Sequence, residues 1–164
     1  MTNVTMQIRP LQDGDMNDVV QLSLLAWKPV FAAWERILGA QLYPIAIYPD
    51  WRKSQAEAVE KACRNEKLTT WVAEVEGVVA GFIVYELNDA TKVGEVQLLA
   101  VRPDHQNRGI GTELNLFALQ KLKEGGMKLA VVGTGGDEGH APARRSYEKA
   151  GFTGLPAVRY YQVL

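Results

Sequence analysis

Residues 106–111 read QNRGIG, and this stretch lies between an apolar run and a segment with a helical pattern. Gly109 and Gly111 flank the apolar Ile110, and Arg108 precedes them. Glycine lets a backbone approach a ligand closely, and the free N–H groups at a helix start favour an anion. The stretch therefore predicts a phosphate-binding loop, to which Arg108 adds a charged donor. The alternative is a tight strand-to-helix turn that needs glycine only for its backbone angles.

The composition describes a single globular domain over residues 1–164. The chain has 47% hydrophobic residues, which is enough for a real core at this length. Its net charge is −1 and its Lys and Arg residues are scattered, which argues against nucleic acid or an anionic membrane as a partner. Cys63 is the only cysteine, so no internal disulfide can form. No signal-like or membrane-length apolar run is present, and we expect a cytoplasmic location.

The hydrophobic pattern before the loop alternates between strand and helix periods. It predicts a strand at 4–10, a helix from about Met16 that breaks at Pro29, and a short second helix to about Leu38. A loop at 42–50 follows, and then a helix from its cap Asp50 to Glu66. Two strands within 68–87 are joined at Glu76-Gly77, and a further strand covers 93–101. Leu98 and Leu99 interrupt the alternation of the strand at 93–101, which indicates a β-bulge there.

The pattern after the loop predicts two more helices and two more strands. A helix at 112–122 stops at Gly125-Gly126, and a short, wholly apolar strand at 128–134 is expected to be buried. A helix at 142–150 has Pro142 in its first turn, and residues 158–164 close the chain as a strand. The order β-α-α-β-β-β-α-β-α-β defines an α/β fold with a mixed sheet.

Three motifs fall in the stretch from Glu95 to Phe152, and their combination is more specific than any one of them. They are V-x-P at Val101 and Pro103, Q-x-x-G-x-G at Gln106, Gly109 and Gly111, and A-x-x-x-Y-x-x-x-G-F at Ala143, Tyr147, Gly151 and Phe152. The stretch resembles the GNAT superfamily of acetyl-CoA-dependent N-acetyltransferases. The resemblance implies a mostly antiparallel mixed sheet, flanked by helices and splayed between its fourth and fifth strands.

The same resemblance implies acetyl-CoA as the acetyl donor and no metal. The pyrophosphate would lie on the loop, and the pantetheine arm would pair with the strand edge at Leu99 and Val101. Many family members have Asn where this chain has His140, and that side chain reaches the cofactor arm. The loop residues implied in cofactor binding are Gln106, Asn107, Arg108, Gly109, Ile110, Gly111 and Thr112.

Two residues are implied in catalysis. Tyr147 would protonate the departing thiolate, since a phenol and a thiol have comparable pKa values. Glu95 matches the position of a catalytic Glu in some members and would accept the proton of the amine, directly or through a water. The alternatives are a core tyrosine and a solvated strand-end carboxylate, and Glu86 and Glu74 are the reserve bases.

The acceptor is expected to be a small-molecule or peptide amine. The residues expected to line its pocket are Trp27, Phe31, Tyr43 and Tyr48, although Trp27 and Phe31 share a helical face with Trp34 and could belong to the core. A homodimer is left open. Two functions are compatible with the sequence: an N-acetyltransferase, and a non-catalytic acyl-CoA-binding or sensing module on the same fold.

Overall fold

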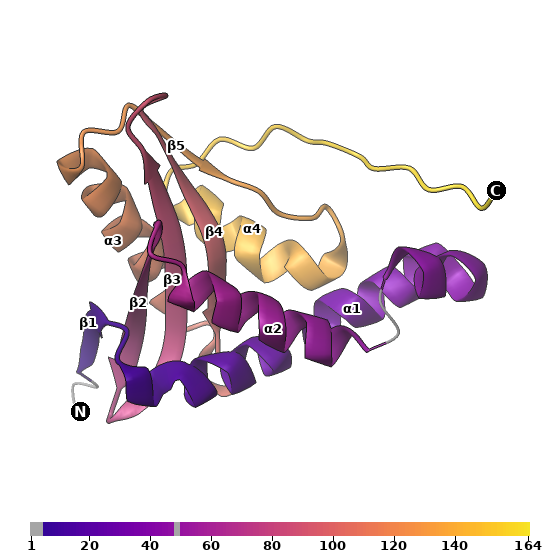
Figure 1. The fold of residues 1–164 in the computed structure, drawn as a ribbon, viewed down its shortest axis with the longest axis horizontal. Helices are drawn as coiled ribbons and strands as arrows, with labels where there is room; N and C mark the ends of the chain where they lie inside the picture. Colours follow the sequence, from indigo (N-terminus) through magenta and orange to yellow (C-terminus); the bar gives the residue numbers. More distant parts are fainter. Residues whose placement is uncertain (1–4, 48–49) are drawn as a thin grey trace.

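The computed structural model describes residues 5–47 and 50–164 (Figure 1). A five-stranded sheet has the order β1-β2-β3-β4-β5, antiparallel except for the parallel pair β4 and β5. This arrangement confirms the predicted fold class. The elements are β1 (Met6–Pro10), α1 (Met16–Ala46), α2 (Trp51–Arg64), β2 (Leu68–Val75), β3 (Val78–Asn88), β4 (Val93–Val101), α3 (Ile110–Glu124), β5 (Leu129–Val132) and α4 (Ala141–Lys149), with short 3-10 turns η1 (Asp13–Asp15), η2 (Pro103–His105) and η3 (Glu138–His140).

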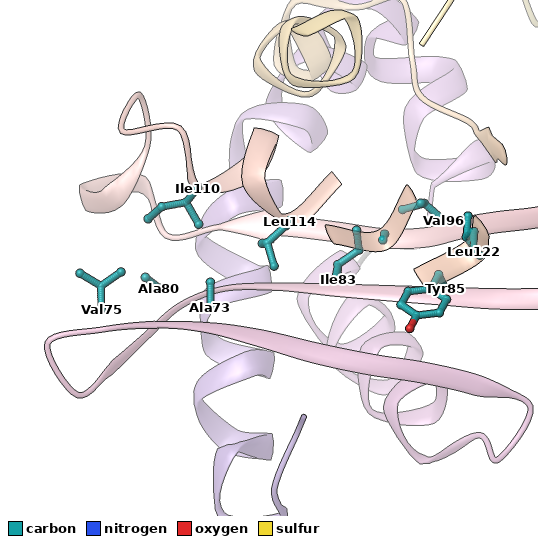
Figure 2. Close-up of a cluster of buried hydrophobic side chains, with 10 residues drawn as sticks. Ala73, Val75, Ala80, Ile83, Tyr85, Val96, Ile110, Leu114 and Leu122 are labelled. Carbon is teal, nitrogen blue, oxygen red and sulfur yellow. The ribbon is translucent and has the colours of Figure 1, made fainter. Parts of the chain in front are cut away.

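Helices cover both faces of the sheet, and each face has its own apolar core. Figure 2 shows the first core, where Leu114 and Leu122 of α3 face Ile83 and Tyr85 of β3. The second core lies under α1 and α2 and contains the fully buried Phe82 among its members. Burying a side chain of this size stabilises the fold by about 1.5–3 kcal/mol. The two cores therefore hold the sheet rigidly between its helices.

Local signals in the sequence placed several elements correctly. The hairpin between β2 and β3 turns at Glu76 and Gly77, whose φ angles of 51° and 78° are those of a type I′ turn. Asp50 caps α2, because its Oδ1 accepts a hydrogen bond from the Lys53 N–H at 3.2 Å. Both features confirm the prediction, and α2 ends at Arg64, two residues before the expected end.

A bulge interrupts β4, one residue earlier than predicted. Val84 pairs with Leu98 and Tyr85 pairs with Val96, so Gln97 is the extra residue. Beyond this point β4 also loses its neighbour on the other side, because its pairing with β5 ends at Val96 and Val132. The prediction of a sheet that splays between the fourth and fifth strands is confirmed.

Helix α1 differs from the prediction in two places. It passes through Pro29 without a break, and residues 42–46, expected in a loop, are helical. The helical path is interrupted instead at Gly39, whose φ of 71° and ψ of −179° are not helical. Pro29 removes a hydrogen bond to the carbonyl of Leu25. Leu25 is exposed, so water can take the place of that bond.

The C-terminal part of the prediction is wrong for two segments. The strand predicted at 128–134 forms as β5, but it lies at the edge of the sheet and is not buried as expected. Leu129 and Val131 are 57% and 39% exposed. Residues 158–164, expected as a strand, have no regular structure. Figure 1 shows the chain after α4 running away from the sheet to the C-terminus. A strand needs a neighbour for its backbone hydrogen bonds, and the segment does not lie along the sheet edge.

Candidate active site

A cavity of about 380 Å³ lies where β4 and β5 diverge. The part of β4 from Val96 to Val101 forms one wall, and the loop before α3 forms a second. Helix α4 with the preceding turn η3 lines another side, and α1 adds Trp27 and Val30. The cavity thus brings together segments that are far apart in the chain.

The QNRGIG loop is held against the end of β4. The side-chain amide of Gln106 donates to the carbonyl oxygen of Val101 at 3.0 Å. Asn107 and Gly109 have φ angles of 60° and 84°, which lie in the left-handed region that glycine and asparagine tolerate best. These angles turn the chain sharply from the strand into α3. Gln106 therefore stabilises the loop from within, in addition to lining the cavity.

The N-terminus of α3 opens into this cavity. The first hydrogen bond of α3 runs from the Glu113 N–H to the Gly109 carbonyl at 3.0 Å. The N–H groups of Ile110, Gly111 and Thr112 precede it and have no acceptor within the helix, and all three residues line the cavity. Such N–H groups, together with the helix dipole, favour an anion.

Gly111 allows α4 to approach this helix end. A Cβ atom at Gly111 would lie 3.1 Å from the hydroxyl oxygen of Ser146, which is tighter than ordinary contacts. Ser146 in turn accepts a hydrogen bond from the side chain of the fully buried Asn115 at 2.8 Å. The glycine thus meets a steric requirement of α3–α4 packing as well as the requirement of a close ligand approach.

The positively charged side chains that line the cavity come from α4, whereas the sequence pointed to Arg108 of the loop. Arg108 is exposed and does not line the cavity. Arg145 and Lys149 of α4 do line it. Sequence reasoning did not select them, although their i,i+4 spacing places them on one side of the predicted helix. An anion at the start of α3 would therefore have its charged neighbours on α4.

Tyr147 lies in the cavity wall and is 9% exposed. Its ring packs edge-on against Phe152 at 5.9 Å between centroids. Burial raises the pKa of Tyr147 to about 12. Among the described residues, no side chain or backbone group is in hydrogen-bond contact with its hydroxyl. The phenol is therefore protonated at neutral pH and available to a ligand.

His140 also lines the cavity and is held by a buried carboxylate. Its Nδ1–H donates to Oδ2 of Asp137 at 2.6 Å, and the indole N–H of Trp34 donates to the same oxygen at 3.1 Å. The Asp137 side chain is only 6% exposed. With Nδ1 engaged, Nε2 is the imidazole nitrogen left for a ligand.

Two glycines and an arginine build the turn that carries this pair. Gly139 packs against the backbone of α1, where an added Cβ would lie 2.6 Å from the Val30 Cα. Arg144 donates to the carbonyl oxygens of Gly135 and Asp137, both at 2.6 Å. The turn therefore has a defined shape, and α1 and α4 are fixed relative to each other through it.

The three candidate bases lie outside the cavity wall. Glu95 is exposed and stands opposite Glu86 in the pairing of β3 and β4. Its neighbour Gln97 lines the cavity and donates to Glu86 at 3.4 Å. Glu74 is engaged elsewhere, because it accepts a hydrogen bond from Arg9 Nε at 2.8 Å. Glu74 therefore serves to hold Arg9 between β1 and β2.

The aromatic residues expected around the acceptor separate into two groups. Trp27 lines the cavity, whereas Phe31 and Tyr43 do not. Phe31 stacks on Trp51 at 4.4 Å and meets Trp34 edge-on at 5.3 Å, so it joins α1 to α2. Tyr48 lies outside the described residues.

Neither a metal-binding cluster nor a membrane-spanning helix occurs in the part of the chain that the structure describes. Within residues 5–47 and 50–164, no cluster of three or more His, Cys, Asp and Glu side chains could hold a metal ion. No helix in the same ranges is sufficiently long and apolar to cross a bilayer.

A mixed sheet that splays beside an open helix N-terminus is the architecture that the sequence motifs predict for a domain of the GNAT type. Comparison with known families agrees: the model of the acetyltransferase (GNAT) family matches residues 31–152. The chain therefore belongs to the GNAT acetyltransferase family.

Sequence relatives include two mycothiol acetyltransferases. The protein from Saccharomonospora viridis is 33% identical over 129 residues, which cover 69% of this chain and 42% of the relative. The protein from Thermomonospora curvata is 27% identical over 159 residues, which cover 94% of this chain and 52% of the relative. The chain thus spans about half the length of these curated relatives.

Solved structures with the same fold include two N-acetyltransferases. PaiA N-acetyltransferase from Thermoplasma acidophilum, in complex with coenzyme A, has a TM-score of 0.65 and 18% identity, covering 91% of this chain and 90% of its own. An aminoglycoside N-acetyltransferase in complex with CoA has a TM-score of 0.61 and 15% identity, covering 98% and 96%. At these identities the likeness concerns the fold alone.

Proposed function

We propose that this chain is an N-acetyltransferase that moves an acetyl group from acetyl-CoA to a primary amine. The transfer proceeds by direct attack of the amine in a ternary complex. One observation carries the proposal: a single cavity contains the open N-terminus of α3, the unpaired edge of β4 and the protonated hydroxyl of Tyr147. We treat residues 1–164 as one such domain.

The loop before α3 would hold the cofactor's pyrophosphate. The N–H groups from about Asn107 to Thr112 supply donors, and those at the helix start have no acceptor within the helix. Arg145 and Lys149 supply positive charge from the neighbouring helix. Arg108 is exposed, so it would contribute from the rim. The residues present thus fit a diphosphate group.

The free edge of β4 would hold the pantetheine arm. Beyond Val96 this edge has no strand beside it among the described residues, and Leu99 and Val101 line the cavity. A linear chain with amide groups can pair with such an edge as an added strand does. His140 faces the same cavity, and its Nε2 would contact the arm or the acceptor.

Tyr147 would act as the general acid. In the reaction the amine nitrogen bonds to the thioester carbonyl carbon, the C–S bond breaks, and the departing thiolate takes a proton. Burial raises the pKa of Tyr147 to about 12, so the phenol is protonated at neutral pH. The same burial disfavours any anion beside it, so a thiolate formed in the cavity would also be more basic than in water and would take this proton. The hydroxyl has no protein acceptor among the described residues to compete for that proton.

Two groups compete for the role of proton acceptor. Glu95 stands on β4 close to the cavity but does not line it, so it would act through a water. His140 lines the cavity and is oriented by Asp137. An amine with an ordinary pKa is mostly protonated at neutral pH and needs such a base. Of the two groups, His140 is favoured as the proton acceptor, because it lines the cavity and Glu95 does not.

The acceptor is proposed to be a small polar molecule with a primary amine. The relatives found by sequence are named mycothiol acetyltransferases, and one structural neighbour is an aminoglycoside N-acetyltransferase. Trp27 and Val30 provide an apolar side to the cavity. Glu138, whose carboxylate pairs with Arg36, adds a polar residue to the lining. A peptide amine is the second acceptor class.

Release of free thiol from acetyl-CoA tests the function. The full chain would be assayed against aminoglycosides, polyamines, amino acids and peptide N-termini. We expect turnover with at least one class and saturable binding of acetyl-CoA without any acceptor. Tight binding with no turnover across the panel would favour a non-catalytic acyl-CoA-binding module. No binding of acetyl-CoA would contradict both functions.

A further inference from the structure

The chain has three serines, all in helices, and the third differs from the other two. The hydroxyls of Ser23 and Ser54 donate to carbonyl oxygens of the preceding turn, at 2.7 and 3.3 Å. Helical serines commonly use their hydroxyls in this way. Ser146 of α4 makes no such bond: among the described residues its hydrogen-bond partner is Asn115, and there the serine oxygen accepts. Its hydroxyl proton is therefore free to donate to a ligand.

Asn115 of α3 sets the direction of that proton. Its side-chain amide donates to the Ser146 oxygen at 2.8 Å, so the O–H bond of the serine points away from Asn115. Asn115 is fully buried, and its Oδ1 has no partner in the described part of the chain. A buried polar atom without a partner costs stability. Packing of α3 on α4 does not require this cost, because an apolar side chain of similar size would fill the same space.

The free hydroxyl lies beside the start of α3. A Cβ atom built on Gly111 would lie 3.1 Å from the oxygen of Ser146. Gly111 belongs to the first turn of α3, whose N–H groups have no acceptor within the helix, and both residues line the cavity. Ser146 therefore adds a side-chain donor to the backbone donors at this helix start.

The face of α4 around Ser146 suits an anion. Arg145 and Lys149 line the cavity beside it, and residues three and four apart lie on the same side of a helix. Glu148, the one acidic residue of α4, does not line the cavity. Hydrogen bonds to an ionised acceptor such as a phosphate oxygen are stronger than those between neutral groups. The position of Ser146 is thus suited to a phosphate group.

We propose that the hydroxyl of Ser146 donates to an oxygen of the acetyl-CoA pyrophosphate, and that Asn115 is the positioning residue that directs it. This role rests on the proposed function, in which the loop before α3 holds the pyrophosphate. The contact would bind the anion to α4 as well as to α3. Because Tyr147 is the next residue, the same contact would hold the turn of α4 that carries the proposed acid.

Comparison of two acetyl donors tests this contact. S-acetylpantetheine has the thioester and the arm of acetyl-CoA but no phosphate. Affinities for the full chain are measured without acceptor, by calorimetry for acetyl-CoA and by NMR titration for the smaller donor. Ser146→Ala should weaken acetyl-CoA binding about ten-fold, the effect of one lost hydrogen bond to a charged group. It should leave the affinity for S-acetylpantetheine unchanged.

Ser54→Ala is the matched control. Ser54 is also a half-buried serine within a helix, but it lies outside the cavity lining. We expect this variant to bind both donors as the wild type does. Circular dichroism verifies that each variant is folded.

A double variant separates ligand recognition from helix packing. Asn115→Leu/Ser146→Ala replaces the polar pair with apolar side chains and removes the unpaired Oδ1. We expect its stability in urea to be no lower than that of Ser146→Ala, and its acetyl-CoA affinity to be equally reduced. Wild-type affinity in the double variant would mean that the pair serves packing alone.

Two results with Ser146→Ala would overturn the inference. Unchanged acetyl-CoA affinity in the folded variant would mean that the serine proton is used inside the protein, as it would be if the Asn115 amide were turned around. An equal loss of affinity for both donors would indicate a general disturbance of the cavity. Either result leaves the transferase function standing, since thiol release by the wild type tests it. If the wild type binds no acetyl-CoA, the inference and the proposed function fail together.

Discussion

His140 and Asp137 form a pair in which the Nδ1 of one lies 2.6 Å from Oδ2 of the other. Burial alone would raise the pKa of Asp137, but the hydrogen bonds from His140 and Trp34 outweigh it, and the pKa is lowered. The carboxylate is therefore ionised at neutral pH and fixes the orientation of the imidazole. Because Trp34 belongs to α1, the pair also connects that helix to the start of α4.

The variant Asp137→Asn should disturb this connection. It retains the size of the side chain but loses the charged acceptor, and we expect a loss of about 1–3 kcal/mol in the free energy of unfolding. Urea denaturation at neutral pH measures it. Asp89→Asn is a suitable control, because Asp89 forms its ion pair with Lys92 at an exposed site. Equal stabilities of the two variants would mean that the buried pair contributes nothing.

The pair also predicts how activity depends on pH. If His140 accepts the proton, His140→Gln should lose most of kcat/KM near neutral pH. Part of it should return at high pH, where the amine is already neutral. Glu95→Gln should then reduce activity no more than Glu86→Gln does. The reverse ranking, with high-pH recovery only in Glu95→Gln, would assign the role to Glu95 acting through water.

Tyr147→Phe should lower kcat by about 10- to 1,000-fold, because it removes one proton-transfer group. Acetyl-CoA affinity, measured by calorimetry, should barely change, since the ring still packs against Phe152. Tyr85→Phe is the control: Tyr85 is also buried, but its hydroxyl accepts a hydrogen bond from Trp71. A wild-type rate for Tyr147→Phe across pH would reduce Tyr147 to a core residue.

Burial of Tyr147 also predicts a change of stability in alkali. Its pKa is about 12 in the folded chain against 10.0 for an ordinary tyrosine, so the folded state holds the proton more tightly. The stability tied to this proton is fully present below pH 10 and is lost as pH rises toward 12. Between pH 9 and pH 11.5 the loss should be about 2 kcal/mol larger in the wild type than in Tyr147→Phe. Denaturant melts at pH 9 and about pH 11.5 compare them, and parallel losses in both proteins would refute this.

Gly111→Val should weaken acetyl-CoA binding by about ten-fold or more while the fold survives. The added side chain would push against Ser146, 3.1 Å from the first new carbon, and would cover the N–H groups at the start of α3. Gly14→Val is the control, since a Cβ there meets nothing within 4 Å. Unchanged affinity in a folded Gly111→Val protein would place the pyrophosphate elsewhere.

Much of the fold could be predicted because its signals are local. The turn at Glu76-Gly77 requires a particular backbone conformation, and the cap at Asp50 acts on N–H groups a few residues away. The GxG loop and Tyr147 belong to motifs with fixed spacing, and the structure brings both to one cavity. Such features depend on neighbours in the chain, so the sequence alone determines them.

The remaining features depend on which surfaces meet. Asp137 has no recognisable motif, and only the packing of η3 on α1 brings Trp34 within 3.1 Å of it. Helix α1 continues through Pro29 where Leu25 is exposed, so water can replace the lost hydrogen bond to the Leu25 carbonyl. Strand β5 is exposed because, among the described residues, no strand pairs with its outer edge. Residues 158–164 have a strand sequence, but a strand forms only where another backbone accepts its hydrogen bonds. The sequence by itself determined the local backbone, the apolar faces and the motifs that reach the cavity. Tertiary contacts decided that Trp34 and Asp137 meet and that residues 158–164 do not form a strand.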